Sequence, residues 1–224
     1  MIYLQFCVCA LFTTRLLLKK VEKRNIMSKV LYIKANIKPE GASRSYEISD
    51  AFICEYQKQH PEDEIVTLDL YKEDIDFLRA EDLGVLFGPK TEESKNHPHL
   101  KYAYQFVEAD KYVVSAPMWN LSIPAILKAY IDYVSVSGIT FKYTESGPVG
   151  LCEGKKALYV VSRGGAYENT PFEMGERYLR TIFGFFGITD METISAENVD
   201  GNPEKAGEIV EEAKKKAQAL AATF

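Results

Sequence analysis

The sequence has few of the side chains that build metal centres and disulfide frameworks. Only four of its 224 residues are cysteine and three are histidine, and neither a CxxC nor an HExxH spacing occurs. His60, His97 and His99 all sit beside proline in polar surroundings, which is typical of solvated turns. We therefore expect no metal site and no disulfide scaffold, and a reducing cytoplasm is the predicted location.

Two phosphate-binding fingerprints are missing as well. There is no GxxxxGK[ST], which argues against a triphosphate P-loop, and no GxGxxG, which argues against the usual dinucleotide turn. Residues 27–224 carry a formal charge of −9, because residues 1–26 hold five basic side chains against one acidic side chain. A body this acidic argues against binding nucleic acid through its phosphates.

Residues 1–26 differ from the rest of the chain. An apolar run from Ile2 to Phe12 precedes a basic stretch. This run is too short to cross a bilayer, and it lacks the leading charges and small-residue cleavage site of a secretory signal. We interpret residues 1–26 as a non-native or disordered extension, with an interfacial anchor as the alternative. Residues 27–224 are expected to form one globular domain, with no membrane association.

Strand and helix patterns alternate throughout this domain. Strands are predicted at residues 30–33, 64–70, 112–116, 157–161 and 192–196. Helices are predicted near residues 48–56, 100–109, 122–137, 172–186 and 203–222. Residues 71–95 are expected to form a loop with at least one helical turn, and residues 138–150 a short hairpin. The alternation predicts an α/β fold with a doubly wound five-stranded parallel sheet, order 2-1-3-4-5, and helices on both faces.

The loop after the first strand predicts an anion site. It runs from Lys34 to Ser45 and leads into a helix; its polar side chains include Asn36, Ser43, Arg44 and Ser45. The first N–H groups of a helix lack partners and carry partial positive charge, so hydroxyl groups beside them suit a phosphate. A simpler alternative is that one of the serines only caps the helix. Because the nucleotide fingerprints are absent, we predict a serine-lined monophosphate site.

Two more irregular loops follow neighbouring strands of the predicted sheet. One consists of Pro117, Met118, Trp119, Asn120 and Leu121, and the other of Ser162, Arg163, Gly164 and Gly165. The indole of Trp119 offers a broad face to a planar ring, and main chain without side chains can approach a flat heteroaromatic closely. Each loop also has an ordinary explanation as a turn or a packing element. Their joint placement at one edge of the sheet favours a binding site. Ser122 is predicted to cap the next helix.

From Met27 to the C-terminus the chain resembles the FMN-dependent NADH:quinone oxidoreductases that also act as NADH azoreductases, within the flavodoxin-like superfamily. The resemblance is carried by residues 28–31, 43–45, 116–120, 141–145, 147–148, 162–165 and 183–188. Two positions depart from the family pattern: Trp119 stands where Tyr or Phe is frequent, and Leu121 where Phe is frequent. Both departures would reshape the substrate pocket without abolishing FMN binding.

The resemblance implies tightly bound FMN, with NADH or NADPH as co-substrate and quinones or azo compounds as acceptors. It implies two-electron, ping-pong hydride transfer through the cofactor, with no catalytic side chain. The FMN phosphate would lie among Asn36, Ser43, Arg44 and Ser45, and the ring between residues 117–121 and 162–165. Substrate would contact Phe141, Trp119 and Tyr167. A homodimer with active sites at its interface is also implied.

Two alternatives remain open from the sequence. The first is a flavodoxin-type electron carrier, which would bind FMN but pass single electrons to a protein partner. The second is a relative of the FMN reductases whose site has decayed into an assembly surface. Reduction of the flavin by NADH, with turnover on menadione, would favour the enzyme over both.

Overall fold

The fold is built on a five-stranded parallel sheet. The computed structural model describes residues 27–39 and 41–224, so the predictions for residues 1–26 lie outside the described residues. The strands are β1 (Lys29–Lys34), β2 (Glu64–Asp69), β3 (Lys111–Pro117), β6 (Lys156–Ser162) and β7 (Asp190–Ala196). Their order is β2-β1-β3-β6-β7, which is the predicted 2-1-3-4-5 once the two hairpin strands are left out of the count.

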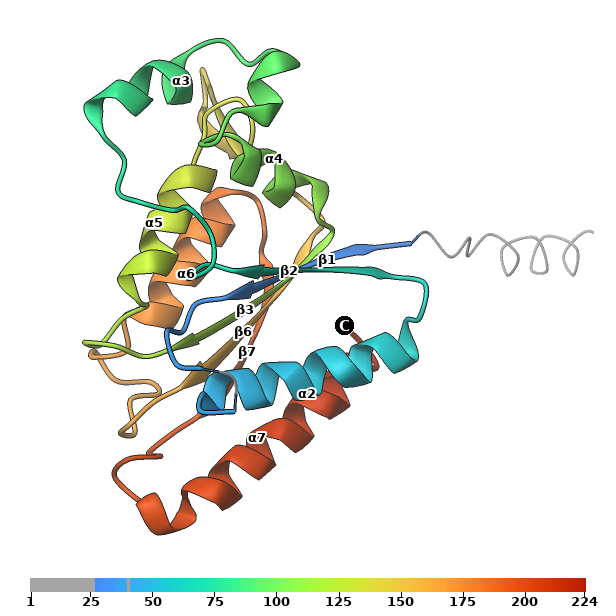
Figure 1. The fold of residues 1–224 in the computed structure, drawn as a ribbon, viewed down its shortest axis with the longest axis vertical. Coiled ribbons are helices and arrows are strands. Elements are labelled where there is room, and N and C mark those ends of the chain that lie inside the picture. The colour runs from blue at the N-terminus through green and yellow to red at the C-terminus, as the bar shows by residue number, and fades with distance from the viewer. Residues whose placement is uncertain (1–26, 40) are drawn as a thin grey trace, which may run out of the picture.

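Helices cover both faces of this sheet (Figure 1). On one side lie α2 (Arg44–Gln59) and α7 (Ala206–Ala221); on the other lie α4 (Lys101–Glu108), α5 (Ala125–Val134) and α6 (Gly175–Phe185). Successive side chains of a strand point to opposite faces. In β1, Val30 and Tyr32 therefore pack with α2 and α7, whereas Leu31 and Ile33 join the core under α4, α5 and α6.

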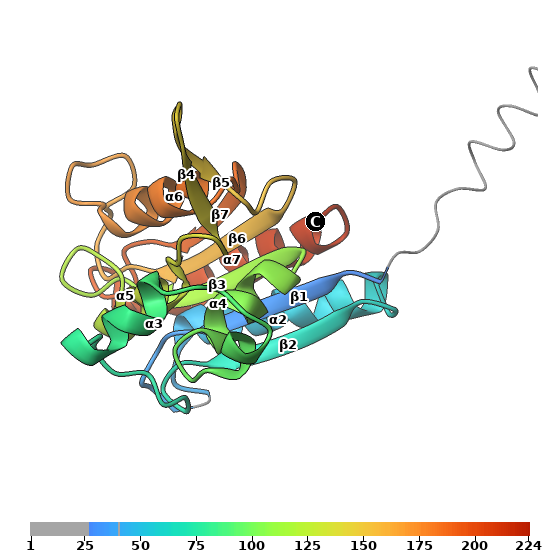
Figure 2. The same cartoon turned by 90° about the horizontal axis from the view of Figure 1, so that it is seen from above.

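The predictions for the two irregular regions are confirmed. The segment after β2 contains η1 (Ala80–Asp82), α3 (Leu83–Phe87) and η2 (Glu93–Asn96), and η3 (Pro203–Lys205) precedes α7. The strands β4 (Phe141–Thr144) and β5 (Gly147–Gly150) pair as an antiparallel hairpin. Figure 2 shows this hairpin standing out from the body beside α6.

Buried tyrosines make stability sensitive to alkaline pH. Burial raises the pKa of Tyr112, Tyr130 and Tyr159 well above the ordinary tyrosine value. The folded protein therefore holds these tyrosine protons more tightly than the unfolded chain does. The stability that results is fully present below about pH 10, the pKa of an unfolded tyrosine, and is lost as the pH rises above it. We expect the free energy of unfolding, measured by urea titration at successive pH values, to fall from about pH 10 upward.

Two variants test whether the loss of stability at alkaline pH comes from the buried tyrosines and not from titration of lysines. The hydroxyl of Tyr130 is buried and has no hydrogen-bond partner within the part of the chain that the structure describes. Tyr130→Phe should therefore weaken the alkaline loss without lowering stability at neutral pH. Tyr143, which is 70% exposed, supplies the control, since Tyr143→Phe should leave the profile unchanged. Equal profiles for the two variants would contradict the assignment.

Candidate functional site

The three predicted loops meet at the edge where β1, β3 and β6 end, here called the carboxyl edge. The N–H of Met118 donates to the carbonyl of Ser162 at 3.0 Å, which joins the second loop to the third. The hydroxyl of Ser115, in β3, donates to the carbonyl of Ser45 at 3.1 Å, which joins the first loop to β3. These bonds fix the relative positions of the three loops, which we call the serine turn (residues 36–45), the tryptophan turn (residues 117–121) and the glycine turn (residues 162–165).

The serine turn is buried and internally hydrogen-bonded. Asn36 donates from Nδ2 to the hydroxyl of Ser43 at 2.7 Å, and the hydroxyls of Ser43 and Ser45 lie 3.1 Å apart. The N–H of Tyr46 donates to the Ser43 hydroxyl at 3.3 Å, so Ser43 is the N-cap of α2. Ser43 therefore caps α2, but the cap uses its hydroxyl only as an acceptor. The cap does not use the hydroxyl protons of Ser43 and Ser45 or the first amides of the helix beside them, which can act as donors.

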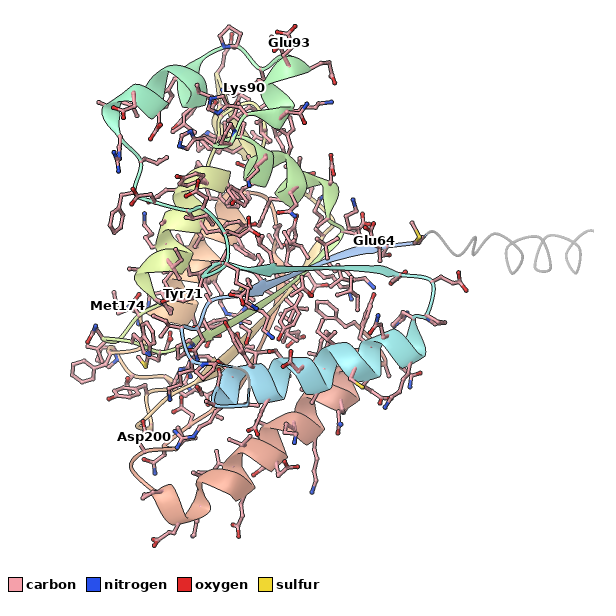
Figure 3. The ribbon with its side chains drawn as sticks, viewed as in Figure 1. Glu64, Tyr71, Lys90, Glu93, Met174 and Asp200 are labelled. Carbon is pink, nitrogen blue, oxygen red and sulfur yellow. The ribbon has the colours of Figure 1, made fainter. Side chains whose placement is uncertain are left out.

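Arg44 adds a positive charge to this turn. Its Nη1 lies 2.6 Å from Oδ1 of Asp200, in the segment that follows β7. Figure 3 labels Asp200 near the start of α2, and Met174 at the same side of the molecule. The main chain of Met174 donates to the carbonyl of Leu121 at 3.1 Å, so the start of α6 supports the tryptophan turn.

The tryptophan turn has a strained backbone. Asn120 and Leu121 both have positive φ, 49° and 69°, between Trp119 and Ser122. Trp119 and Ser122 exchange two main-chain bonds, of 2.9 and 3.0 Å, as the ends of a tight two-residue turn. The prediction that Ser122 caps α5 is wrong: Pro124 occupies the N-cap position, because Ser122 is used to close the turn. Asparagine and glycine suit such a turn, whereas leucine does not.

Replacing Leu121 with asparagine should therefore stabilise the protein. Releasing a leucine from left-handed backbone is expected to raise the free energy of unfolding by about 1 kcal/mol, measured by urea denaturation. Leu151→Asn is the matched control, because Leu151 is equally exposed, 39% against 38%, and does not have a positive φ. An equal change in both variants would show that replacing an exposed leucine with a polar side chain, and not release of backbone strain, is responsible.

The two glycines of the third loop lie close to the side chains of Asp200 and Tyr167. A Cβ on Gly164 would lie 2.8 Å from Oδ2 of Asp200, and one on Gly165 would lie 3.0 Å from the ring of Tyr167. Asp200 and Gly201 also donate their main-chain N–H groups to the carbonyl of Gly164. The segment after β7 thus forms a fourth wall of the carboxyl edge, and Tyr167 lies against Gly165.

The side chain of Arg163 is fully buried among three carboxylates and so turns away from solvent. Its Nη1 lies 2.7 Å from Glu197, and its Nη2 lies 3.2 Å from both Glu173 and Glu176. Burial opposes the charge of Arg163, but the hydrogen bond to Glu197 and the nearby carboxylates outweigh it and raise the pKa of the guanidinium. Any contact of Arg163 with a ligand at the carboxyl edge would therefore come from its main chain.

Phe141 does not share the surroundings of Trp119 and Tyr167. It lines a hollow of about 450 Å³ with residues of α3 and the hairpin, among them Phe87 and Tyr143. Its ring centroid lies 4.6 Å from that of Phe185. The structure thus places Trp119 and Tyr167 on loops of the carboxyl edge, and Phe141 in the hollow between α3 and the hairpin.

Three residues of the carboxyl edge were not predicted from the sequence: Ser115, Tyr46 and Asp200. Ser115 is a fully buried polar residue inside an apolar strand, and the Tyr46 hydroxyl donates to the carbonyl of Asn36 at 2.9 Å. The run Glu197 to Gly201 follows the fifth predicted strand, as the other polar loops follow theirs. That repeated position was a usable signal for Asp200.

In residues 27–39 and 41–224, no group of three or more His, Cys, Asp or Glu side chains is arranged to hold a metal ion. No helix in the same ranges is both long enough and apolar enough to cross a membrane.

Known proteins resemble this chain over most of its length. The profile of a family described as having a flavodoxin-like fold matches residues 28–221. An FMN-dependent NADH:quinone oxidoreductase of Clostridium perfringens is 69% identical over 198 residues, which cover 88% of this chain and all of that protein. A protein of the same name from Clostridium beijerinckii is 66% identical over the same shares.

Solved structures show the same likeness. An azoreductase from Bacillus anthracis str. Sterne superposes with a TM-score of 0.80 at 40% identity, covering 88% of this chain and all of that one. An FMN-dependent NADH-azoreductase from Bacillus anthracis str. Ames Ancestor, solved in complex with FMN, gives a TM-score of 0.75 at 28% identity. The superposition covers 87% of this chain and all of that one.

Proposed function

Because the chain belongs to the flavodoxin-like FMN-dependent NADH:quinone oxidoreductases, we propose that it carries two electrons from NADH through FMN to quinones. Its likeness to azoreductases extends the proposed acceptors to azo compounds. The observation that supports this most directly is the convergence of the serine, tryptophan and glycine turns at one edge of a parallel sheet. Ligands of open α/β sheets bind at that edge.

The donors of the serine turn fit the phosphate of FMN. Buried hydroxyls of Ser43 and Ser45, the amide of Asn36 and the start of α2 all lie within one turn, and Arg44 lies beside them. Hydroxyl and N–H donors at a helix N-terminus are the groups that bind phosphate in other folds. We assign these four residues to the phosphate, which they would hold and orient.

The ring of FMN would lie between the other two turns. Trp119 and its neighbours from Pro117 to Leu121 would support the ring from one side, and the main chain from Ser162 to Gly165 from another. Main-chain N–H groups of these turns are positioned before any reaction, so they can stabilise negative charge without reorganisation. FMN itself supplies the electron-transfer chemistry when bound, which is why no nucleophile or general acid is required of the protein.

One measurement tests the proposed function. Purified protein loaded with FMN should show the visible spectrum of a bound flavin, lose its absorbance on addition of NADH without oxygen, and regain it with menadione. Continuous turnover with both substrates is expected. Protein that stays colourless after addition of FMN, or a bound flavin that NADH does not reduce, would contradict the proposal. The latter result would favour the electron-carrier alternative, which the comparisons do not favour.

We further propose a homodimer that completes the active site. Large apolar side chains are exposed around the hollow between α3 and the hairpin, including Leu83, Phe87 and Tyr143. A contiguous apolar surface of this kind marks an interface. A second copy bound at this surface would bring the hairpin of one subunit, with its Phe141, toward the carboxyl edge of the other subunit.

Sedimentation at micromolar protein concentration should give twice the mass of one chain. In the Phe87→Glu variant the measured mass should fall to that of a single chain.

The remaining proposals follow from the same reading. The functional unit is the doubly wound, FMN-binding domain of residues 27–224, which is supported by the family match over residues 28–221. A cytoplasmic location is supported by the reactants, since NADH is an intracellular reductant. It is also supported by the cysteines of the described part, Cys54 and Cys152, both of which are free thiols.

A further inference from the structure

The loop that follows β6 is attached to the rest of the protein almost entirely through one neighbouring segment. Arg163 donates its N–H to the carbonyl of Ala196, and Val199 donates back to the carbonyl of Arg163. Asn198 donates to the carbonyl of Gly165, as Asp200 does to that of Gly164. The main chain of residues 163–165 is therefore fixed to residues 196–200.

Beyond Gly165, a single side chain continues this attachment. Glu197 accepts the N–H of Tyr167 at 2.7 Å and the N–H of Glu168 at 3.0 Å, both on Oε2. Its other oxygen, Oε1, accepts Nη1 of the buried Arg163 at 2.7 Å. One carboxylate thus ties the loop to the guanidinium beneath it, and both of its oxygens are used.

The other side of this loop offers little support. Residues 168–171 border a hollow of about 520 Å³, whose opposite wall is formed by α6 through Glu176, Arg177 and Arg180. Asn169, at the tip of the loop, has a positive φ of 59°. Since the loop spans a hollow, the two bonds to Glu197 are what hold Tyr167 against Gly165.

We propose that Glu197 is a positioning residue for substrate binding, which it serves by holding Tyr167 over the glycine turn. The inference depends on the proposed function, because it takes the carboxyl edge to be the site where substrate meets the cofactor. Glu197 does not contact substrate in this scheme; it acts through the N–H groups of Tyr167 and Glu168. Arg163, in turn, holds the carboxylate in this orientation through its Nη1.

Glutamine is the informative replacement for Glu197. It has the same shape, but one of its two terminal atoms is a donor. Whichever way the amide is turned, its NH₂ must face either the Arg163 guanidinium or the two loop N–H groups, and both are donors. Glu176→Gln is the matched control. Glu176 also contacts Arg163 and has nearly the same exposure, 21% against 20%, but its other bonds go to Arg180 and Thr193 and not to the loop.

The experiment compares the two variants with the unaltered protein at saturating FMN. For Glu197→Gln we expect the KM for menadione to rise about tenfold while kcat stays within about twofold, because substrate is bound less well but reacts as before. For Glu176→Gln we expect both constants to stay within about twofold. Equal rises in KM for both variants would overturn the proposal, since they would show that charge near Arg163, and not the loop, is responsible.

Amide hydrogen exchange of the unaltered protein without FMN gives a second, independent test. The amides of Tyr167 and Glu168 lie outside every helix and strand, yet we expect them to exchange about 100-fold more slowly than unprotected amides. Exchange at the unprotected rate would overturn the proposal even if Glu197→Gln failed to fold. If the amides are protected but the protein oxidises no NADH, the proposed function fails and the attachment of the loop by Glu197 stands.

Discussion

Replacing Ser43 and Ser45 together with alanine should weaken FMN binding by about 10²- to 10⁴-fold. Each hydroxyl is assigned a hydrogen bond to a charged phosphate, worth about 1.5–3 kcal/mol, and 1.4 kcal/mol corresponds to a factor of ten in affinity. Titration of apoprotein with FMN, followed by flavin fluorescence, measures the dissociation constant directly. Both serine side chains are buried, so no surface group can move into their place and restore the lost hydrogen bonds.

This variant also removes a helix cap, and the experiment must separate the two effects. Loss of the Ser43 cap should cost about 1 kcal/mol of folding stability. Ser49→Ala is the control: Ser49 is equally buried, one turn along α2, and its hydroxyl bonds to Ser115 and to the carbonyl of Ser45. It should lower stability and leave FMN affinity nearly unchanged. Unchanged affinity in the double variant would remove the serine turn from the phosphate site.

Replacing Arg163 with methionine should have the largest effect on stability. The change leaves Glu173, Glu176 and Glu197 around a buried position without their cation. Breaking a buried ion pair from one side costs about 3–5 kcal/mol, which for a chain of this length lowers Tm by about 6–20 °C. Calorimetry or urea denaturation of the apoprotein measures the loss. Arg180→Met is the control; Arg180 is partly exposed, also contacts Glu176, and should cost about 1 kcal/mol.

The effect of Arg163→Met should depend on pH. In the unaltered protein, hydrogen bonds from Arg180 and Thr193 outweigh burial and lower the pKa of Glu176. A lowered pKa contributes stability above about pH 4.3, the pKa of an unfolded glutamate, and this stability is lost as the pH falls through the folded value. Arg163 also donates to Glu176, so Arg163→Met removes part of this stabilisation. The stabilities of the two proteins should therefore converge as the pH falls below about 4.3, and a constant difference would contradict the assigned charges.

The sheet and its order could be predicted from sequence because their signals are local. Apolar runs such as residues 30–33 and 157–161 identify buried strands, and short connections restrict a parallel sheet to a few orders. The same order places three loops at one edge, so the convergence of the serine, tryptophan and glycine turns was also predictable. The family resemblance extended this to a cofactor and a reaction, which the relatives carry in their names.

Features that depend on contacts distant in sequence were not predictable. Ser122 has the residue type of a cap, and only the pair of bonds to Trp119 shows that it closes a turn. Arg163 stands within a loop motif, and its burial depends on carboxylates 10, 13 and 34 positions along the chain, which no local pattern reveals. Gly164 suggested close approach of a ligand, and only the structure shows that the carboxylate of Asp200 lies beside it as well. In each case the residue type suggested a role, but the residue that it contacts could not be identified from the sequence.

The order of the sheet leaves β2 and β7 as its two outer strands, and this bears on behaviour at high protein concentration. An uncovered outer strand can recruit a strand from another molecule and begin a fibril. Here β2 carries the exposed Glu64, and β7 carries the exposed Asp190 and Glu192. Pairing of the outer strands of two molecules would bring these carboxylates together, so extension of the sheet by another molecule is opposed at both outer strands. The homodimer proposed above would instead form through the apolar side chains around α3.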